Sequence, residues 1–189
     1  MRARAVDAEL WVDDTTLNVQ TRAKRQTNQV TLTYGQGLFE FSAMADLANQ
    51  ATGFSVTGWD VAAKQPLSYR ATSSTLAGEI NGDLSGSAAL QQAIGAREQQ
   101  VVHELPFTLQ EAQALAEAGY RRWARHFVTG TGLADGDGRI QVGTKLTLEG
   151  LGNLFNGKFY VTSVRHVFDP EIGYRTWFAV ERPGIGQSP

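Results

Sequence analysis

The acidic, glycine-rich segment at residues 134–140 comes closer to a metal-binding pattern than any other stretch of this sequence. Asp135 and Asp137 alternate with glycines, as the carboxylate ligands of a helix–loop–helix calcium site do. With these aspartates at the third and fifth loop positions, Leu133 takes the first position and Thr144 the last, where acidic ligands belong. Two of the strongest ligands are therefore missing, and strands are expected on both sides. The pattern favours an acidic turn, and we predict no metal site.

Nucleophile and base signatures are also missing from the sequence. His103, His126 and His166 are far apart, and none has a histidine or cysteine at ligand spacing. Zero cysteines exclude disulfides, thiolate metal sites and cysteine nucleophiles. The Gly-Gln-Gly at residues 35–37 lacks the third glycine of a dinucleotide fingerprint, and no Walker A or G-x-S-x-G sequence occurs. We predict no catalytic and no cofactor-binding residues, no cofactor and no enzymatic activity.

Two further groups have the right residue types to bind a ligand. A basic cluster near the end of a predicted helix consists of Arg121, Arg122, Arg125 and His126. These side chains could contact phosphate, but a positive helix end also suits the helix dipole without any ligand. Trp59 and Trp123 could bind a sugar or a peptide; more often such residues are core or interface anchors.

Length and composition indicate an ordinary globular protein. The chain has 189 residues, 42% of them apolar, and a formal net charge of -2. A dedicated nucleic-acid binder would normally be basic, so no nucleic-acid partner is expected. No apolar run approaches the ~20 residues that cross a bilayer, so we expect no direct membrane insertion.

Short strands alternate along the first third of the chain. Residues 9–12 and 16–19 are β-prone and flank an Asp-Asp-Thr turn, which predicts a hairpin. We interpret residues 1–26 as a hairpin and linker, the remnant of a preceding domain. A period of two, typical of half-buried strands, is clear at residues 38–44 and 54–59. Further strands are expected at 30–34 and 66–71, followed by a surface excursion over 73–86 and a short helix over 87–94.

The clearest helix begins at Thr108 and extends to about residue 128. Thr108 and Glu111 form a capping box, and an apolar stripe that includes Leu115, Trp123 and Phe127 follows at helical spacing. The period then returns to two, with strands at 144–149, 158–168 and 174–181 and a hairpin loop at 169–173. The fold class is mainly β with one long helix. We predict that residues 27–189 form a single antiparallel β-barrel domain with the helix at its flank.

The C-terminal strands carry a resemblance to a known family. The sequences that carry it lie at residues 143–152, 159–169, 173–176 and 180–184. They resemble the closing segment of the phage late control protein D and Vgr-type baseplate hub family. Residues 56–60 look like the strand end that opens this region in the family, and residues 10–14 with 17–19 resemble the hairpin that closes the preceding domain.

The resemblance implies a tail-tube-like barrel and a structural role. In the family, a homotrimer whose chains each bear two related barrels imitates a ring of six tube subunits and joins the sixfold tail tube to the threefold spike. The implied partners are the tail tube protein, a separate spike protein and other baseplate components. The implied location is the baseplate of a virion tail or injection particle, assembled in the bacterial cytoplasm.

One alternative is a carbohydrate-binding or peptidoglycan-acting β domain of a tail or secreted protein. Such an enzyme needs a pair of carboxylates facing one cleft, and Asp135 and Asp137 in a flexible turn are poor candidates. A nucleic-acid-binding barrel is another alternative, but it requires a basic groove with exposed aromatic residues, which the charge balance disfavours.

Overall fold

The computed structural model describes residues 2–80, 83–101 and 105–186, and their contacts divide them into two compact units. Of the described residues, the first unit takes those within 1–25, 47–81 and 85–124, and the second takes those within 26–46, 82–84 and 125–189. Within the described ranges, no helix combines the length and apolar character needed to span a bilayer.

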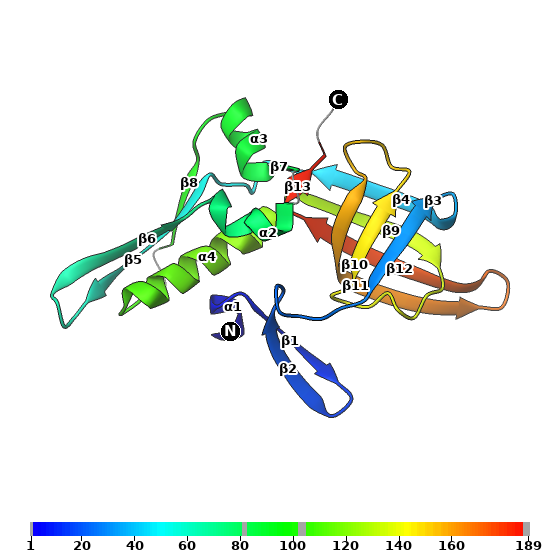
Figure 1. The fold of residues 1–189 in the computed structure, drawn as a ribbon, viewed down its shortest axis with the longest axis horizontal. Coiled ribbons are helices and arrows are strands. Elements are labelled where there is room, and N and C mark those ends of the chain that lie inside the picture. Colours follow the sequence, from blue (N-terminus) through cyan, green and yellow to red (C-terminus); the bar gives the residue numbers. More distant parts are fainter. Residues whose placement is uncertain (1, 81–82, 102–104, 187–189) are drawn as a thin grey trace. The chain divides into compact units, whose positions relative to one another are not determined.

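The first unit combines two small sheets with helices (Figure 1). Its elements are α1 (Arg2–Ala5), β1 (Ala8–Asp13), β2 (Thr16–Thr21), β5 (Gly53–Asp60), β6 (Gln65–Ala71), the 3-10 helix η1 (Ser73–Leu76), α2 (Ala77–Ile80), α3 (Gly86–Ala93), β8 (Glu98–Val101) and α4 (Leu109–Arg125). Strands β1 and β2 form an antiparallel hairpin, which confirms the predicted one. Strand β5 pairs antiparallel with β6 and parallel with β8. The short β7 (Leu84–Ser85) comes at a boundary between the units in the sequence.

Helix α4 begins almost as its sequence predicts. The Thr108 hydroxyl accepts a hydrogen bond from the Glu111 amide at 3.2 Å, the first half of a capping box. In a full capping box the Glu111 carboxylate would accept from the Thr108 amide. Here it accepts instead from the amide of Phe107, at 3.0 Å. The apolar stripe of α4 packs on a core cluster that includes Phe54, Val56 and Leu76.

The second unit is a closed β-barrel (Figure 1). Its strands are β3 (Gln29–Tyr34), β4 (Gly37–Ala45), β9 (Val128–Asp135), β10 (Lys145–Glu149), β11 (Gly157–Asp169) and β12 (Gly173–Arg182), and the short β13 (Gly184–Ile185) follows them. Around the barrel the order is β10-β11-β12-β9-β4-β3. Most neighbours are antiparallel, but β3 pairs parallel with both β10 and β4.

Aromatic rings fill the barrel interior. The Phe41 ring meets Phe159 edge-on at 5.7 Å and stacks with Phe178 at 6.5 Å. Glycines on β9 leave room for these rings, because a Cβ at Gly130 would come within 2.8 Å of Phe41 and one at Gly132 within 2.5 Å of Phe178. The barrel is therefore a packed core rather than a pore.

The predicted fold class, mainly β with a closed barrel and one long helix, is confirmed. The prediction of one barrel over the whole range from residue 28 to 182 is wrong for residues 47–80 and 85–124. Strands β5 and β6 form their own sheet with β8, and α4 packs on that sheet. Residues 73–86, expected to be a surface excursion, instead hold η1 and α2 and bury Leu76 completely.

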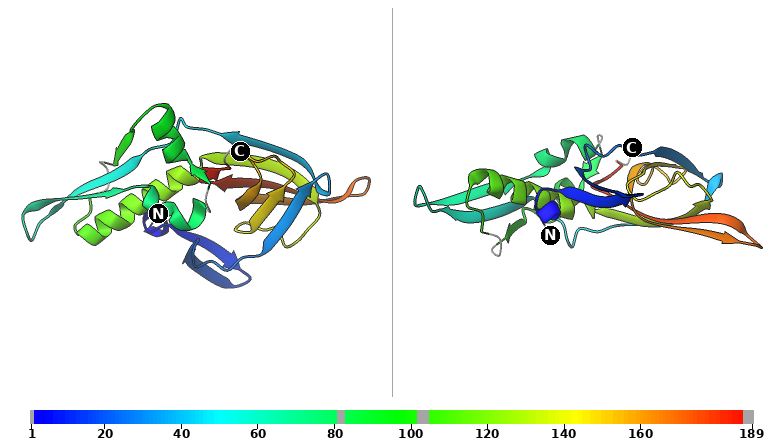
Figure 2. Two further views of the ribbon diagram at one scale, coloured as in Figure 1. Left: turned by 45° about the horizontal axis from the view of Figure 1, so that its top comes forward. Right: turned by 90° about the horizontal axis from the view of Figure 1, so that it is seen from below.

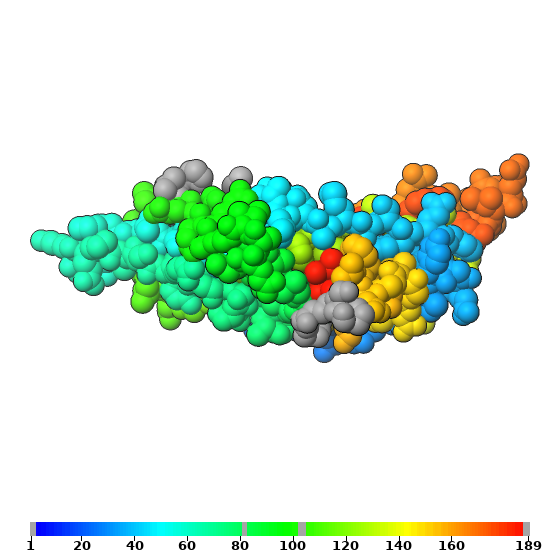
Figure 3. All heavy atoms as spheres, turned by 90° about the horizontal axis from the view of Figure 1, so that it is seen from above, coloured from blue at the N-terminus to red at the C-terminus, as the bar shows by residue number. Residues whose placement is uncertain are grey.

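The β11–β12 hairpin extends past the rest of its sheet (Figure 2). Toward the hairpin loop, the pairing of β12 with β9 ends at Arg175, and the pairing of β11 with β10 ends at Tyr160. Asp169 shapes the predicted loop, since its Oδ1 accepts from the Glu171 amide at 2.8 Å and from the Ile172 amide at 3.1 Å. In the space-filling view the orange residues of this hairpin project as an arm (Figure 3).

Candidate functional site

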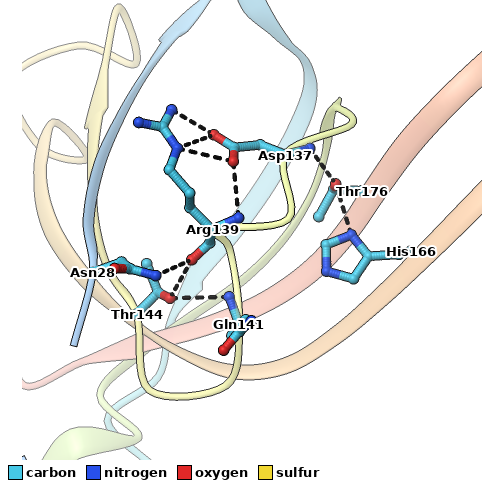
Figure 4. A network of polar contacts seen from close by, with 7 residues as sticks. All are labelled: Asn28, Asp137, Arg139, Gln141, Thr144, His166 and Thr176. Carbon is cyan, nitrogen blue, oxygen red and sulfur yellow. Dashed lines mark hydrogen bonds and ion pairs between the residues drawn. The ribbon is translucent and has the colours of Figure 1, made fainter.

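The acidic segment at residues 134–140 ends in a loop that is held by hydrogen bonds and an ion pair (Figure 4). The Asp137 carboxylate binds the Arg139 guanidinium through Nε at 3.0 and 3.1 Å and through a terminal nitrogen at 2.7 Å. It also accepts from the Arg139 amide at 2.9 Å. These hydrogen bonds from Arg139 lower the pKa of Asp137 below its ordinary value, against the opposing effect of partial burial.

The other candidate calcium ligand also contacts an arginine. Asp135 accepts a 2.8 Å hydrogen bond from Arg175, across the β9–β12 pair. Leu133 lies inside β9, and Thr144 uses its hydroxyl to accept from the Gln141 amide at 2.9 Å and to donate to the Arg139 carbonyl at 3.0 Å. Among the described residues, no group of three or more acidic, histidine or cysteine side chains could hold a metal ion. The absence of a metal site remains a prediction.

His166 ties this loop to the β11–β12 hairpin. Its Nε2 lies 3.0 Å from the Ile140 carbonyl, so this nitrogen carries the proton in the neutral ring. Its Nδ1 lies 3.1 Å from the Thr176 hydroxyl and 3.0 Å from the Tyr174 hydroxyl. The Thr176 oxygen in turn accepts from the Asp137 amide at 3.1 Å (Figure 4). His166 therefore connects the loop backbone to side chains of β12.

His126 lies at a shallow pocket on the barrel wall. The pocket, about 420 Å³, is lined by residues of β4, β9, β11 and β12 together with His126. The His126 Nδ1 lies 3.0 Å from a carboxylate oxygen of Glu181, which is almost fully buried. Ser42, Thr129 and Thr131 line the same pocket. No local sequence pattern indicates this pocket, because its lining comes from four separate strands. The third histidine, His103, lies outside the described residues.

The basic cluster at the end of α4 is divided among separate partners. Arg121 pairs with Glu117 at 3.0 Å and lies 3.8 Å from Asp7. Arg122 donates to the Arg4 carbonyl at 3.0 Å, and Arg125 is buried. The cluster therefore does not converge on one exposed phosphate-sized site, which supports the helix-end interpretation.

The two tryptophans differ in their environments. Trp123 is partly buried, with its ring edge-on to Phe54 at 6.0 Å, so it anchors the core of the first unit. Trp59 is more than half exposed at the end of β5. It is one of several large apolar side chains that the two units leave in contact with water, and some of the others lie on the β1–β2 and β11–β12 hairpins. Exposed apolar patches of this kind mark interaction sites.

Comparison with protein families gives one match. The model described as the Alg8 N-terminal domain matches residues 1–169. The chain belongs to the Alg8 N-terminal domain family. This match does not show the late control protein D family predicted from the sequence, and that assignment stays a prediction. Among curated proteins, no match is found.

Solved structures share the fold of this Alg8 N-terminal domain. A 43 kDa tail protein of prophage MuSo2 from Shewanella oneidensis superposes with a TM-score of 0.66 at 16% identity, over 96% of this chain and 51% of that one. A tail protein from Neisseria meningitidis MC58 gives 0.62 at 14% identity, over 97% and 53%. A chain in the virion of a native gene transfer agent particle gives 0.52 at 13% identity, over 96% and 38%. At these identities the likeness shows the fold alone, and the chain spans about half the length of the two tail proteins.

Proposed function

We propose that this chain is a structural, non-enzymatic component of a phage-type tail. The observation that carries the proposal is the fold, since 96% of the chain superposes on a prophage tail protein with a TM-score of 0.66. Folds host many functions, so the fold alone is an analogy. The sequence adds independent support, because the segments that resemble tail hubs form β10, β11 and β12 of the barrel.

Within the tail, we assign the chain to the baseplate hub. A homotrimer of the complete protein would form a ring between the sixfold tail tube and the threefold spike. The partners would be the tube protein, a separate spike protein and other baseplate components, after assembly in the bacterial cytoplasm. The β1–β2 hairpin would close a preceding domain, in keeping with a chain that spans about half of the tail proteins it resembles.

The chemistry of the polar residues supports a role without catalysis. Asp135 and Asp137 both form ion pairs with arginines, whereas a glycosidase needs one carboxyl group protonated and another free to attack. His166 is held by three neighbours in the loop network. The pocket at His126 contains a carboxylate and hydroxyl groups but contains no serine–histidine pair at hydrogen-bonding distance among the described contacts.

Cryo-electron microscopy of the parent particle tests this proposal. We expect density for the barrel at the junction between tube and spike, in three copies, and light scattering of the complete protein should give a trimer. Glycan and peptide substrates should remain intact in the presence of the purified chain. A location away from the tail, or measurable hydrolysis that a point substitution in this chain abolishes, would overturn the proposal.

A further inference from the structure

The pocket beside His126 lies on the outer face of the barrel. Residues that lie opposite each other on paired strands share a face of the sheet. Two such rows cross β4, β9 and β12, with Ser42, Thr131 and Ala179 in one and Met44, Thr129 and Glu181 in the other. All of these residues line the pocket of about 420 Å³. We call it the outer-face pocket.

This pocket is concave because short side chains lie between longer ones. Ala179 comes between Trp177 and Glu181 along one face of β12, since alternate residues of a strand share a face. Trp177 pairs with Leu133, whereas Ala179 pairs with Thr131. The row of serine, threonine and alanine is therefore lower than the rows beside it, and it leaves room for a side chain from outside.

The outer-face pocket contains a carboxylate and no cationic nitrogen of lysine or arginine. Among the described residues that line it, none is a lysine or an arginine. The Glu181 side chain is only 4% exposed, and one of its carboxylate oxygens lies 3.0 Å from Nδ1 of His126. This contact places the proton of the neutral ring on Nδ1, so Nε2 has a lone pair. The imidazole therefore offers an acceptor to a donor that enters the pocket.

The rest of the lining selects no charge but suits an aliphatic chain. Ser42, Thr131 and Thr162 carry hydroxyls, which both donate and accept. Met44 is exposed and adds an apolar wall next to Ala179. Lysine and arginine side chains combine an apolar stem with a cationic head that only donates. Their chemistry matches an apolar wall beside an imidazole acceptor and a carboxylate.

We infer that the outer-face pocket receives a basic side chain, lysine or arginine, of a partner protein. The head group donates to Nε2 of His126 on the side of Glu181, and the stem lies along Met44 and Ala179. An acidic side chain would meet the charge of Glu181 with no cation of the lining to offset it. A neutral polar side chain would satisfy His126 but would gain nothing from that charge.

The inference deepens the proposed structural role, and it rests on that role for the identity of the partner as a neighbouring tail component. The pocket is accessible to such a partner, because Ser42, Met44 and Thr131 are all exposed. Recognition of the basic head group depends only on residues of this chain. It can therefore be tested on the isolated protein, whatever particle the chain belongs to.

NMR titration of the full chain at about pH 8, where free histidine is neutral, tests the inference. The probes are the peptides Gly-Lys-Gly and Gly-Arg-Gly, with Gly-Glu-Gly and the Nε-acetylated form of Gly-Lys-Gly as controls. We expect the two basic peptides to shift the His126 ring signals saturably, with Kd of about 1 mM. Acetylation removes the charge of lysine and should weaken binding by about tenfold or more. The His166 signals should not respond.

Substitutions at one exposed position locate the site. Thr131→Lys puts an ammonium group of the chain itself into the pocket and should abolish binding of Gly-Lys-Gly. Thr131→Val keeps the shape and should bind within about twofold of the natural chain. Gln65→Lys adds the same charge at an exposed position of the first unit and should leave the affinity unchanged. Circular dichroism of each variant checks that the fold is intact.

The opposite results are as clear. Equal affinity for the acetylated peptide would show that the pocket does not recognise the charge, and tighter binding of Gly-Glu-Gly would reverse the assignment. A His126 signal that no basic peptide shifts saturably, or equal binding by Thr131→Lys, would show that the pocket is not the site. A tail location by microscopy together with a negative titration would overturn this inference and leave the proposed function standing.

Discussion

Gly119 of α4 lies directly against the ring of Phe54 on β5. A Cβ at Gly119 would come 2.3 Å from Cε1 and 2.5 Å from Cζ of that ring. Alanine normally stabilises a helix interior by about 1 kcal/mol relative to glycine. Here Gly119→Ala should instead lower the free energy of unfolding by about 1–3 kcal/mol, because the rigid ring must move.

The matched control for this substitution is Gly78→Ala in α2. A Cβ there meets nothing within 4 Å, so the variant should be neutral or slightly stabilised. Urea unfolding of both variants makes the comparison. A Gly119→Ala protein as stable as the Gly78→Ala protein would show that Phe54 does not pack on the helix as described.

Trp123 should matter for stability and Trp59 should not. The Trp123 side chain is partly buried, and its ring packs edge-on against Phe54. Full burial would make Trp123→Ala cost about 3–5 kcal/mol, so partial burial predicts about 2 kcal/mol. Trp59→Ala, at an exposed position, should change stability by less than about 0.5 kcal/mol. Equal effects of the two substitutions would contradict this assignment of the core.

The sequence was informative where the cause of structure is local. The Thr108 cap, the turn after Asp169 and the period of two in strands such as β3 and β10 act over a few residues, and each appears in the structure. The partner of each strand was not predictable in the same way. A period of two shows that one face is buried but not which element buries it. Strand β5 therefore looked like a barrel strand, although it packs on α4.

The long-range strand pairing and the polar network around His166 could not be predicted from the sequence. The parallel pairing of Lys145 on β10 with Gln29 on β3 joins residues 116 positions apart and has no local signal. The link from His166 to Thr176 and from Thr176 to Asp137 likewise depends on the barrel closing correctly. The sequence shows that no histidine or cysteine lies at ligand spacing from His166. It does not show that Thr176, Tyr174 and Ile140 are the neighbours of His166 in space.

Thr176 should hold the acidic loop on the barrel. Its side chain is fully buried and accepts from the Asp137 amide at 3.1 Å. Thr176→Val keeps the shape but leaves that amide without this acceptor, which should cost about 1–3 kcal/mol. Hydrogen exchange at the Asp137 amide should accelerate. Thr162→Val, which removes an exposed hydroxyl bonded to the Ala179 carbonyl, is the control and should have little effect. Unchanged exchange at Asp137 would refute this role of Thr176.

Calcium should not stabilise the protein. Asp135 and Asp137 would have to exchange their arginine partners for the ion, and the position expected for a bidentate glutamate holds Thr144, whose hydroxyl serves the loop backbone. Millimolar calcium or a chelator should therefore leave the melting temperature unchanged, since a bound ion would raise it by mass action. Magnesium serves as the control for ionic strength. A rise specific to calcium that Asp137→Asn removes would establish the site.

The ion pair of Asp137 with Arg139 should make the barrel sensitive to acid. Hydrogen bonds from Arg139 hold the pKa of Asp137 below its ordinary value of about 3.9. A carboxyl group with a lowered folded-state pKa stabilises the protein above its unfolded-state pKa, and this contribution is lost as the pH falls through the folded-state value. Asp137→Asn should therefore be less stable than the natural chain at pH 7, and the difference should shrink below about pH 4.

Arg139→Gln tests the cause of that effect, because it removes the donor and keeps the carboxylate. It should reproduce the loss at pH 7 and the convergence in acid, while Asp14→Asn at an exposed turn controls for the removal of any carboxylate. Urea unfolding at intervals from pH 7 to pH 2 gives the free energies, and the natural chain and both loop variants should meet at the acidic end. A stability difference that stays constant across this range would mean that the lost stability comes from loop packing and not from the charge of Asp137.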